Sequence, residues 1–270
     1  MPRVEEWLGY ADVDVLCLQE TKLSDKAFPA MAFQALGYES CHFGQGQWNG
    51  VAILSRAGIS DVVNGFAPGL VRATGDDAYT VGVLEEARLI TATCGGVRVS
   101  SVYVPNGRDL GDPHYNAKLV WLSRLREHIA TQSTPDQPVV VTGDFNIAPE
   151  DRDVWDIAKF ASSTHVTPAE RASLNDLCSW GLGDAFRELY QQDRLYTYWD
   201  YRAGDFHQHR GMRIDLLLAS APLLSKVSWG LVDRQARKGK LPSDHAPMII
   251  DFGLTTSTTT TAVPSTAVPS

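Results

Sequence analysis

The segment VVTGDFNIAP, residues 140–149, carries the pattern that decides the fold. Its first residues complete PVVVTG (138–143), a run of β-branched residues typical of a buried strand. Asp144 and Asn146 follow directly, where that strand is expected to end. A single carboxylate at a strand end usually caps a turn or faces water, so this segment does not define a site by itself.

Four other predicted strands show the same change from apolar to polar residues. They are VDVLCL (13–18), VRVSSVYV (97–104), IDLLLAS (214–220) and APMIIDF (246–252). The polar side chains at their ends are Glu20, Tyr103, Asp215, Asp244 and His245. Since functional residues gather where a rigid scaffold presents them, we expect these five strand ends to share one rim.

The remaining patterns predict an α/β fold. GVAILS (50–55) and ARLITATC (87–94) add two buried strands, and the Gly95-Gly96 pair after the second indicates a hairpin and hence antiparallel pairing in a mixed sheet. Pro113 to Ala130 repeats apolar residues at helical spacing, with Asp112 placed to cap the helix. Many strands and few helices favour two packed sheets with helices outside.

Composition sets limits on function and location. The chain has 270 residues and a net charge of −8, so general attraction to nucleic acid or an anionic membrane is not expected, although a local basic groove is compatible with that sum. The four cysteines form no CxxC pair and are expected to be free thiols in a reducing cytoplasm. We find no secretory signal and no apolar run of membrane-spanning length.

One domain is expected over residues 1–254. No repeat of fixed period and no long Pro, Gly or Ser linker divides this part of the chain. From Thr255 the sequence reads TTSTTTTAVPSTAVPS, without charge or apolar periodicity, which predicts a disordered tail over 255–270.

The polar residues at the strand ends indicate metal-assisted chemistry. Their donors are mainly oxygen atoms and include no thiolate, which suits Mg²⁺, with Mn²⁺ as an alternative, and argues against zinc. A hard divalent ion beside an imidazole and a phenol is suited to phosphodiester hydrolysis, in which a carboxylate deprotonates water.

Five motifs then match a family in order along the chain. LCLQETK (16–22), SVYVPNG (101–107), VVTGDFNIAP (140–149), YWDYR (198–202) with RGMRIDLLLAS (210–220), and LPSDHAPM (241–248) resemble those of the exonuclease III family. These apurinic/apyrimidinic endonucleases belong to the endonuclease/exonuclease/phosphatase superfamily. The resemblance implies a four-layer α/β sandwich with two mixed β-sheets packed face to face and helices outside.

The resemblance implies a role for each catalytic residue. Asp144 orients and deprotonates the attacking water, and Asn146 fixes that carboxylate. His245 contacts the scissile phosphate and is oriented by Asp215, whereas Tyr103 donates a hydrogen bond to a phosphate oxygen. For His245 the competing interpretation is a structural histidine.

The resemblance also implies the metal ligands. Glu20 is the principal ligand and Asp244 an outer or second one. The residues expected around the ion are Glu20, Asp144, Asn146, Asp244 and His245.

DNA contacts are implied for side chains on or beside the motifs. They are Lys22, Asn106, Arg108, Lys118, Tyr198, Trp199 and Arg213. For the aromatic pair Tyr198 and Trp199, core packing is an equally open interpretation. The basic run from Arg234 to Lys240 is either a phosphate track or a solvated face.

The implied activity is Mg²⁺-dependent cleavage 5′ to abasic sites in double-stranded DNA, with 3′–5′ exonuclease and 3′-phosphatase activity, by a monomer. Two alternatives stay open at this point. One is a phosphatase acting on small or lipid phosphates, and the other is a catalytically impaired DNA-binding relative. The second arises because family members begin with a TWNVN-like strand whose Asn reaches the metal, whereas this chain starts at the following helix.

Overall fold

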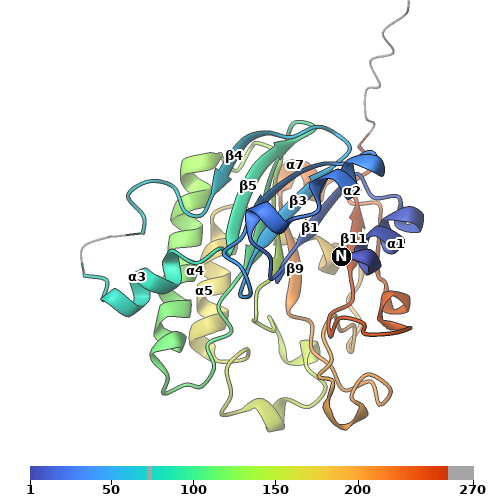
Figure 1. Ribbon diagram of the computed structural model, residues 1–270. Coiled ribbons are helices and arrows are strands. Elements are labelled where there is room, and N and C mark those ends of the chain that lie inside the picture. Colours follow the sequence, from blue (N-terminus) through green and yellow to red (C-terminus); the bar gives the residue numbers. More distant parts are fainter. Residues whose placement is uncertain (72–74, 255–270) are drawn as a thin grey trace, which may run out of the picture.

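The computed structural model describes residues 1–71 and 75–254, which form four layers (Figure 1). The tail expected over 255–270 lies outside the described residues. Two helices cover one face of a large sheet, a smaller sheet covers its other face, and two further helices cover the smaller sheet. The expected α/β sandwich with helices outside is confirmed.

The large sheet has six strands and mixed pairing. The central strands β6 and β7 are parallel to each other, and every other pair of neighbouring strands in this sheet is antiparallel. In spatial order the strands are β4 (Ser60–Asn64), β5 (Leu89–Cys94), β6 (Val97–Tyr103), β7 (Val139–Asp144), β9 (Asp215–Ser220) and β8 (Leu182–Asp184).

The second layer differs from the expected mixed sheet. It is antiparallel and is divided into a three-stranded sheet, β1 (Val15–Leu18), β3 (Val51–Ser55) and β2 (Glu39–Phe43), and a separate pair, β10 (Trp229–Val232) and β11 (Met248–Asp251). Within the described ranges, no ladder of hydrogen bonds joins β1 to β11, so the two parts are separate sheets.

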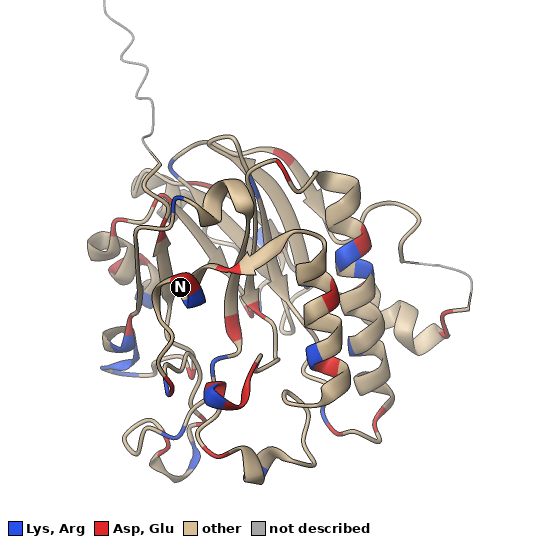
Figure 2. Cartoon of the chain, turned by 180° about the vertical axis from the view of Figure 1, so that it is seen from behind, with Lys and Arg blue, Asp and Glu red and all other residues tan. Residues whose placement is uncertain are grey.

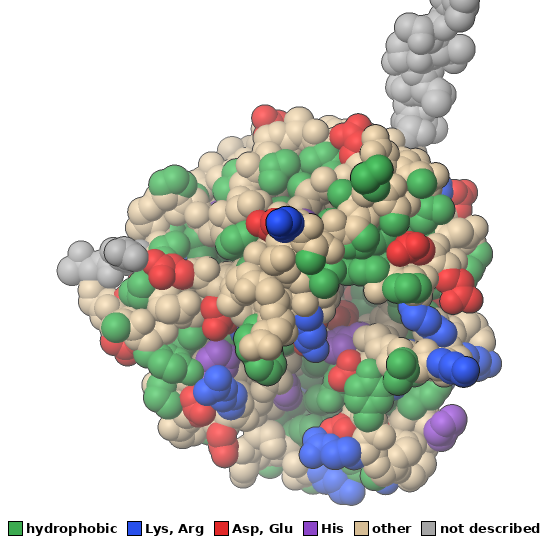
Figure 3. Space-filling model, viewed as in Figure 1, with side chains coloured by type: hydrophobic (Ala, Val, Ile, Leu, Met, Phe, Trp, Pro, Cys, Tyr) green, Lys and Arg blue, Asp and Glu red, His purple; other side chains and the backbone are tan. Residues whose placement is uncertain are grey.

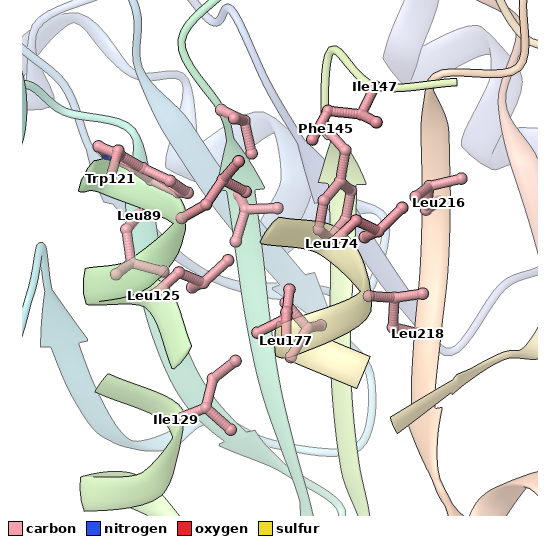
Figure 4. Close-up of a cluster of buried hydrophobic side chains, with 14 of the residues drawn as sticks. Leu89, Trp121, Leu125, Ile129, Phe145, Ile147, Leu174, Leu177, Leu216 and Leu218 are labelled. Atoms are coloured by element: carbon pink, nitrogen blue, oxygen red, sulfur yellow. The ribbon is translucent and has the colours of Figure 1, made fainter. Parts of the chain in front are cut away.

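Helices pack on the outer face of the six-stranded sheet. Trp121, Leu125 and Ile129 of α4 (Pro113–Gln132) and Leu174 and Leu177 of α5 (Pro168–Ser179) contact the sheet in one buried cluster (Figure 4). Helix α4 begins where predicted, because the Asp112 carboxylate accepts the His114 backbone N–H at 2.8 Å. The remaining helices are α1 (Pro2–Ala11), α2 (Ala30–Ala35), α3 (Ala78–Leu84), α6 (Ala185–Leu189) and α7 (Ala221–Leu224).

The alternation of side chains along β3 builds the other two interfaces. Val51 and Ile53 face the six-stranded sheet, whereas Ala52 and Leu54 face α1 and α2. Every residue of β3 is therefore buried, which explains its continuous apolar sequence. The predicted Gly95-Gly96 turn is confirmed between β5 and β6, with positive φ angles of 56° and 82°.

Two further expectations concern the four cysteines and membrane spans. Cys17, Cys41, Cys94 and Cys178 are free, as predicted. No helix among the described residues combines the length and the apolar character that crossing a membrane requires.

The buried His128 makes the stability of the fold depend on pH. The His128 Nδ1 accepts the Ala67 N–H at 3.0 Å, so the proton is on Nε2, which is 3.0 Å from the Thr91 hydroxyl. Protonation would set two N–H groups against each other, and burial followed by the charge of Arg98 lowers the pKa of His128 to about 4. Its contribution to stability is therefore complete above the ordinary pKa of about 6.5 and is lost as pH falls toward 4.

We expect His128→Gln to be destabilised at pH 7 but to lose less stability on acidification. Between pH 7 and pH 4.5, the wild-type free energy of unfolding should fall by about 2 to 3 kcal/mol more than that of the variant. Urea unfolding at both pH values measures this difference. The exposed His207, changed to Gln, is the control; equal acid losses in all three proteins would contradict the assignment.

Candidate active site

Three neighbouring strands bring polar side chains into one row. In the β-ladders Tyr103 lies opposite Asp144, and Asp144 lies opposite Asp215. Side chains alternate between the two faces of a sheet, so Val140, four residues before Asp144, lies on the same face as Asp144. Val140 belongs to the buried cluster between the two sheets. The row therefore lies on the inner face of the six-stranded sheet, at the rim of the sandwich.

Asn146 holds the Asp144 carboxylate from both sides. The Asn146 backbone N–H donates to Asp144 Oδ1 at 2.9 Å, and its side-chain Nδ2 donates to Oδ2 at 3.0 Å. This turn requires a left-handed backbone at Asn146, with φ of 50°, a conformation found mostly at constrained sites. Burial, opposed by the His245 cation, raises the pKa of Asp144 to about 7.

His245 is fixed by Asp215 at the end of the row. Its Nδ1 lies 2.8 and 3.0 Å from the two Asp215 oxygens. Burial disfavours the cation, but the Asp215 carboxylate outweighs it and raises the pKa of His245 to about 10. The Tyr198 ring lies over the imidazole with centroids 5.0 Å apart. His245 is therefore a cation at neutral pH.

Glu20 approaches the row from the opposite sheet. It follows β1 with a left-handed φ of 50°, and its Oε2 lies 2.7 Å from Lys22 Nζ. Burial opposes ionisation, but hydrogen bonds from Lys22 and Tyr103 lower the pKa of Glu20. Burial and the adjacent Glu20 raise the pKa of Tyr103, so its phenol keeps its proton.

The donor set fits a hard cation that brings ligands of its own. Within residues 1–71 and 75–254, no three His, Cys, Asp or Glu side chains converge closely enough to enclose a metal ion. Mg²⁺ typically uses one or two carboxylates and fills its shell with water and substrate phosphate. Glu20 and Asp215 each raise the pKa of Asp144, a mutual repulsion that a nearby cation would relieve.

Two of the expected ligands are engaged elsewhere. A protonated His245 has no lone pair for a metal, and Asn146 Oδ1 accepts from Asn106 at 3.1 Å. The role of Glu20 as the principal ligand stays a prediction. Asp244 is half-buried beside His245, and its backbone oxygen accepts the Trp199 N–H at 3.0 Å.

One face of the molecule has a hollow containing acidic and histidine side chains, with Lys and Arg side chains at its margin (Figure 3). Lys22, Asn106 and Arg108 are exposed and Tyr198 is half-buried, so these four remain accessible to a ligand. Over the rest of the fold, acidic and basic residues are interspersed (Figure 2), as expected of solvated surfaces.

The prediction that Lys118, Trp199 and Arg213 contact DNA is wrong, because their side chains are buried. Lys118, Trp199 and Arg213 are each 0% exposed. Arg213 donates to Asp153 at 2.7 Å and to Asp184 at 2.6 Å. Trp199 packs in the core with Tyr196 and Ala246, which is the alternative interpretation of that aromatic pair. The sequence could not separate these residues from surface cations and rings, because their partners are distant in the chain.

His165 is a residue that the sequence patterns missed. It lines a cavity of about 360 Å³ together with Asn106, Arg108 and Tyr198. Its Nδ1 donates to the Asn146 carbonyl at 2.6 Å, and burial and the Lys118 charge lower the pKa of His165 to about 4. No motif contains it; its left-handed φ of 83° is visible only in the structure.

Exposed Trp48 was missed as well. Its side chain is 64% exposed. The next two residues pair with the Glu20 turn, through Asn49 O to the Lys22 N–H at 2.9 Å and Gly50 O to the Thr21 N–H at 3.1 Å. The segment that follows this exposed ring is therefore joined to the turn that carries Glu20.

Comparison with known proteins shows the family of the chain. The family model described as endonuclease/exonuclease/phosphatase matches residues 2–245. The chain belongs to the endonuclease/exonuclease/phosphatase family. Exodeoxyribonuclease III of Haemophilus influenzae is 29% identical over 250 residues, covering 88% of this chain and 90% of that protein.

Two solved structures in this family have the same fold. An AP endonuclease from Archaeoglobus fulgidus superposes with a TM-score of 0.85 at 32% identity, covering 93% of each chain. The 3′ phosphatase NExo from Neisseria, bound to a product DNA hairpin, gives 0.85 at 36% identity and 94% of each chain. The resemblance to the exonuclease III family drawn from the sequence is confirmed.

Proposed function

We propose that this protein is a Mg²⁺-dependent DNA repair nuclease that cleaves the phosphodiester 5′ to abasic sites and also acts on 3′ ends. The observation that carries the proposal is the row Tyr103, Asp144 and Asp215, completed by His245 and faced by Glu20. It combines a held carboxylate base, an imidazolium and a phenol donor on one rim. Two matched relatives, an AP endonuclease and a 3′ phosphatase, support the two kinds of DNA substrate.

Asp144 acts as the general base. Its carboxylate is held by Asn146, and a pKa near 7 suits proton transfer at neutral pH. Water attacks phosphorus and its proton passes to Asp144, while the bond from phosphorus to the 3′-oxygen breaks and the departing oxygen takes up a proton from solvent. Cleavage leaves a 3′-hydroxyl and a 5′-phosphate.

Positive and hydrogen-bonding groups surround the position of the phosphate. The His245 cation and the neutral Tyr103 phenol donate to its oxygens as negative charge develops. Asp215 keeps the imidazole oriented and charged. A Mg²⁺ ion beside Glu20 would supply electrostatic stabilisation of the phosphoryl and leaving oxygens.

The DNA strand follows the accessible polar side chains around the hollow. Lys22 and Arg108 are exposed cations that can neutralise phosphates, and Trp48 offers a ring on which a base can stack. Because these contacts are local, a chain with net charge −8 can bind DNA.

A gel assay with the purified protein tests the proposal. We expect Mg²⁺-dependent incision of a duplex with one abasic site, and release of nucleotides or phosphate from recessed 3′ ends. EDTA should abolish both, and rising salt should weaken binding steeply. Hydrolysis of small or lipid phosphates without action on DNA would favour the phosphatase alternative. Binding without cleavage would favour the impaired relative.

Glu20→Gln should raise the Mg²⁺ concentration needed for half-maximal activity by about tenfold or more, because one anionic oxygen is lost from a site with few protein ligands. A Mg²⁺ titration of the cleavage rate measures this shift. The exposed Glu188, changed to Gln, is the matched control. An unchanged titration for Glu20→Gln would place the ion elsewhere.

A further inference from the structure

Lys118 is a fully buried cation whose ammonium faces two loops of the site. It is 0% exposed, and its Nζ donates to the Asn146 carbonyl at 2.7 Å and to the Asn106 carbonyl at 3.2 Å. A third bond reaches the Thr164 hydroxyl at 3.2 Å, and the Glu170 carboxylate is the charge partner. The two carbonyls belong to the loops that follow β7 and β6.

Glu170 is equally buried, and both of its oxygens are occupied. Oε1 accepts from the Thr164 hydroxyl at 2.5 Å and the His165 N–H at 2.9 Å. Oε2 accepts from the Thr167 N–H at 3.0 Å and its hydroxyl at 2.8 Å. The carboxylate therefore anchors the ammonium to the start of α5, and it has no remaining freedom to follow a displaced lysine.

Stability alone does not account for this pair. A buried ion pair usually contributes little net stability, since the loss of hydration offsets the attraction, and apolar residues of similar size often replace it without cost. An apolar residue could not donate to the carbonyls of Asn106 and Asn146. The distinguishing property of Lys118 is therefore a donor held at one point between two loops.

The two carbonyls belong to the residues that position Asp144, the proposed general base. Asn146 fixes both Asp144 oxygens, and its own Oδ1 accepts from the Asn106 side chain at 3.1 Å. The ammonium thus binds the backbone of Asn146, whose side chain holds Asp144, and that of Asn106, whose side chain holds Asn146. The clamp also fits closely against Gly107, where an added Cβ would lie 2.7 Å from the Thr164 hydroxyl.

We propose that Lys118, anchored by Glu170, is a positioning residue that sets the Asn146 turn and through it the Asp144 carboxylate, and so governs kcat and not DNA binding. The assignment rests on the proposed nuclease function. It replaces a direct DNA contact of Lys118 with an action through the two loops.

Two variants separate positioning from stability. Lys118→Met removes the donor and leaves Glu170 as an unpaired buried charge. Lys118→Met combined with Glu170→Gln removes that charge as well, so much of the lost stability should return, because an unpaired charge is the costly state. Arg124→Met is the matched control on the same helix, since Arg124 pairs with Asp76 in a largely buried bridge.

We expect kcat on abasic-site DNA to fall about 10- to 100-fold in both Lys118 variants with KM changed less than threefold. Arg124→Met should lose melting temperature but keep kcat. If kcat recovers with stability in the double variant, or if KM rises while kcat stays normal, the positioning role is overturned.

A second measurement is independent of the substrate. Amide hydrogen exchange of a peptide spanning 144–149 should accelerate in the double variant and not in Arg124→Met. Unchanged exchange overturns the proposal even if the protein proves to act on another phosphate ester. If the wild-type protein does not cleave DNA, the nuclease function is contradicted. Faster exchange in the double variant would still support the clamp in that case.

Discussion

Asp144→Asn is expected to lower kcat at least ~100-fold while DNA affinity stays within a few-fold of wild type. An amide of the same shape can still accept the Asn146 backbone N–H on its oxygen, so that half of the turn should persist, whereas its NH₂ would face the Asn146 Nδ2 that donates to the carboxylate in the wild type. It cannot accept a proton from water, and general-base catalysis typically contributes about 10² to 10⁴ in rate. The loss should therefore be confined to the chemical step.

Single-turnover cleavage and a separate binding titration measure the two quantities. Asp251, an exposed carboxylate at the end of β11, provides the matched control as Asp251→Asn. Near-wild-type turnover by Asp144→Asn would transfer the role of base to another group. A large fall in affinity would show that Asp144 mainly organises the binding surface.

Asp215→Asn is expected to lower kcat about 100-fold at pH 8 and less at pH 6. In the wild type, Asp215 outweighs burial and holds the pKa of His245 at about 10, so the imidazole is a cation at both pH values. Without that carboxylate, burial opposes the cation and only Asp144 and Asp244 favour it, so the pKa of His245 falls. The variant therefore loses the cation at a lower pH than the wild type does.

Profiles of kcat against pH, with an NMR titration of the His245 ring, measure this effect. Asp200→Asn, at a partly exposed carboxylate paired with Arg202, is the control. A loss that is independent of pH would mean that Asp215 acts only through geometry. If Asp215→Asn keeps wild-type activity at pH 8 while its His245 is neutral, the His245 cation is not needed for catalysis.

The sequence predicted that polar residues at five strand ends share one rim, because the interruption of an apolar run by polar residues is a local pattern. Val140 and Asp144 share a face by spacing alone, but the apolar run does not say which face this is, since Val139 and Val141 are buried on the opposite face. The same local pattern located Tyr103 and Asp215 at strand ends. Their order in the sheet could not be predicted and is seen only in the structure, because strand pairing across gaps of tens of residues leaves no local pattern.

Burial of charged residues could not be predicted in the same way. Lys118 and Glu170 are separated by 52 residues, and Arg213 and Asp153 by 60. An isolated lysine or arginine beside a DNA-binding motif is more often a surface contact, and only the tertiary structure shows its carboxylate partner. His165 was missed because its position depends on an irregular loop, which has no periodicity to interpret.

Glu20 and Asp144 belong to sheets with different mechanical support. Within residues 1–71 and 75–254, β1 has a hydrogen-bonded neighbour on one side only, whereas β7 is flanked by β6 and β9. Segments with fewer protecting hydrogen bonds open at lower free energy. Mild denaturant should therefore release Glu20, the proposed ligand of the cation, before it disturbs Asp144, the proposed base, giving a form that keeps the row of Tyr103, Asp144 and Asp215 folded but has lost its response to Mg²⁺.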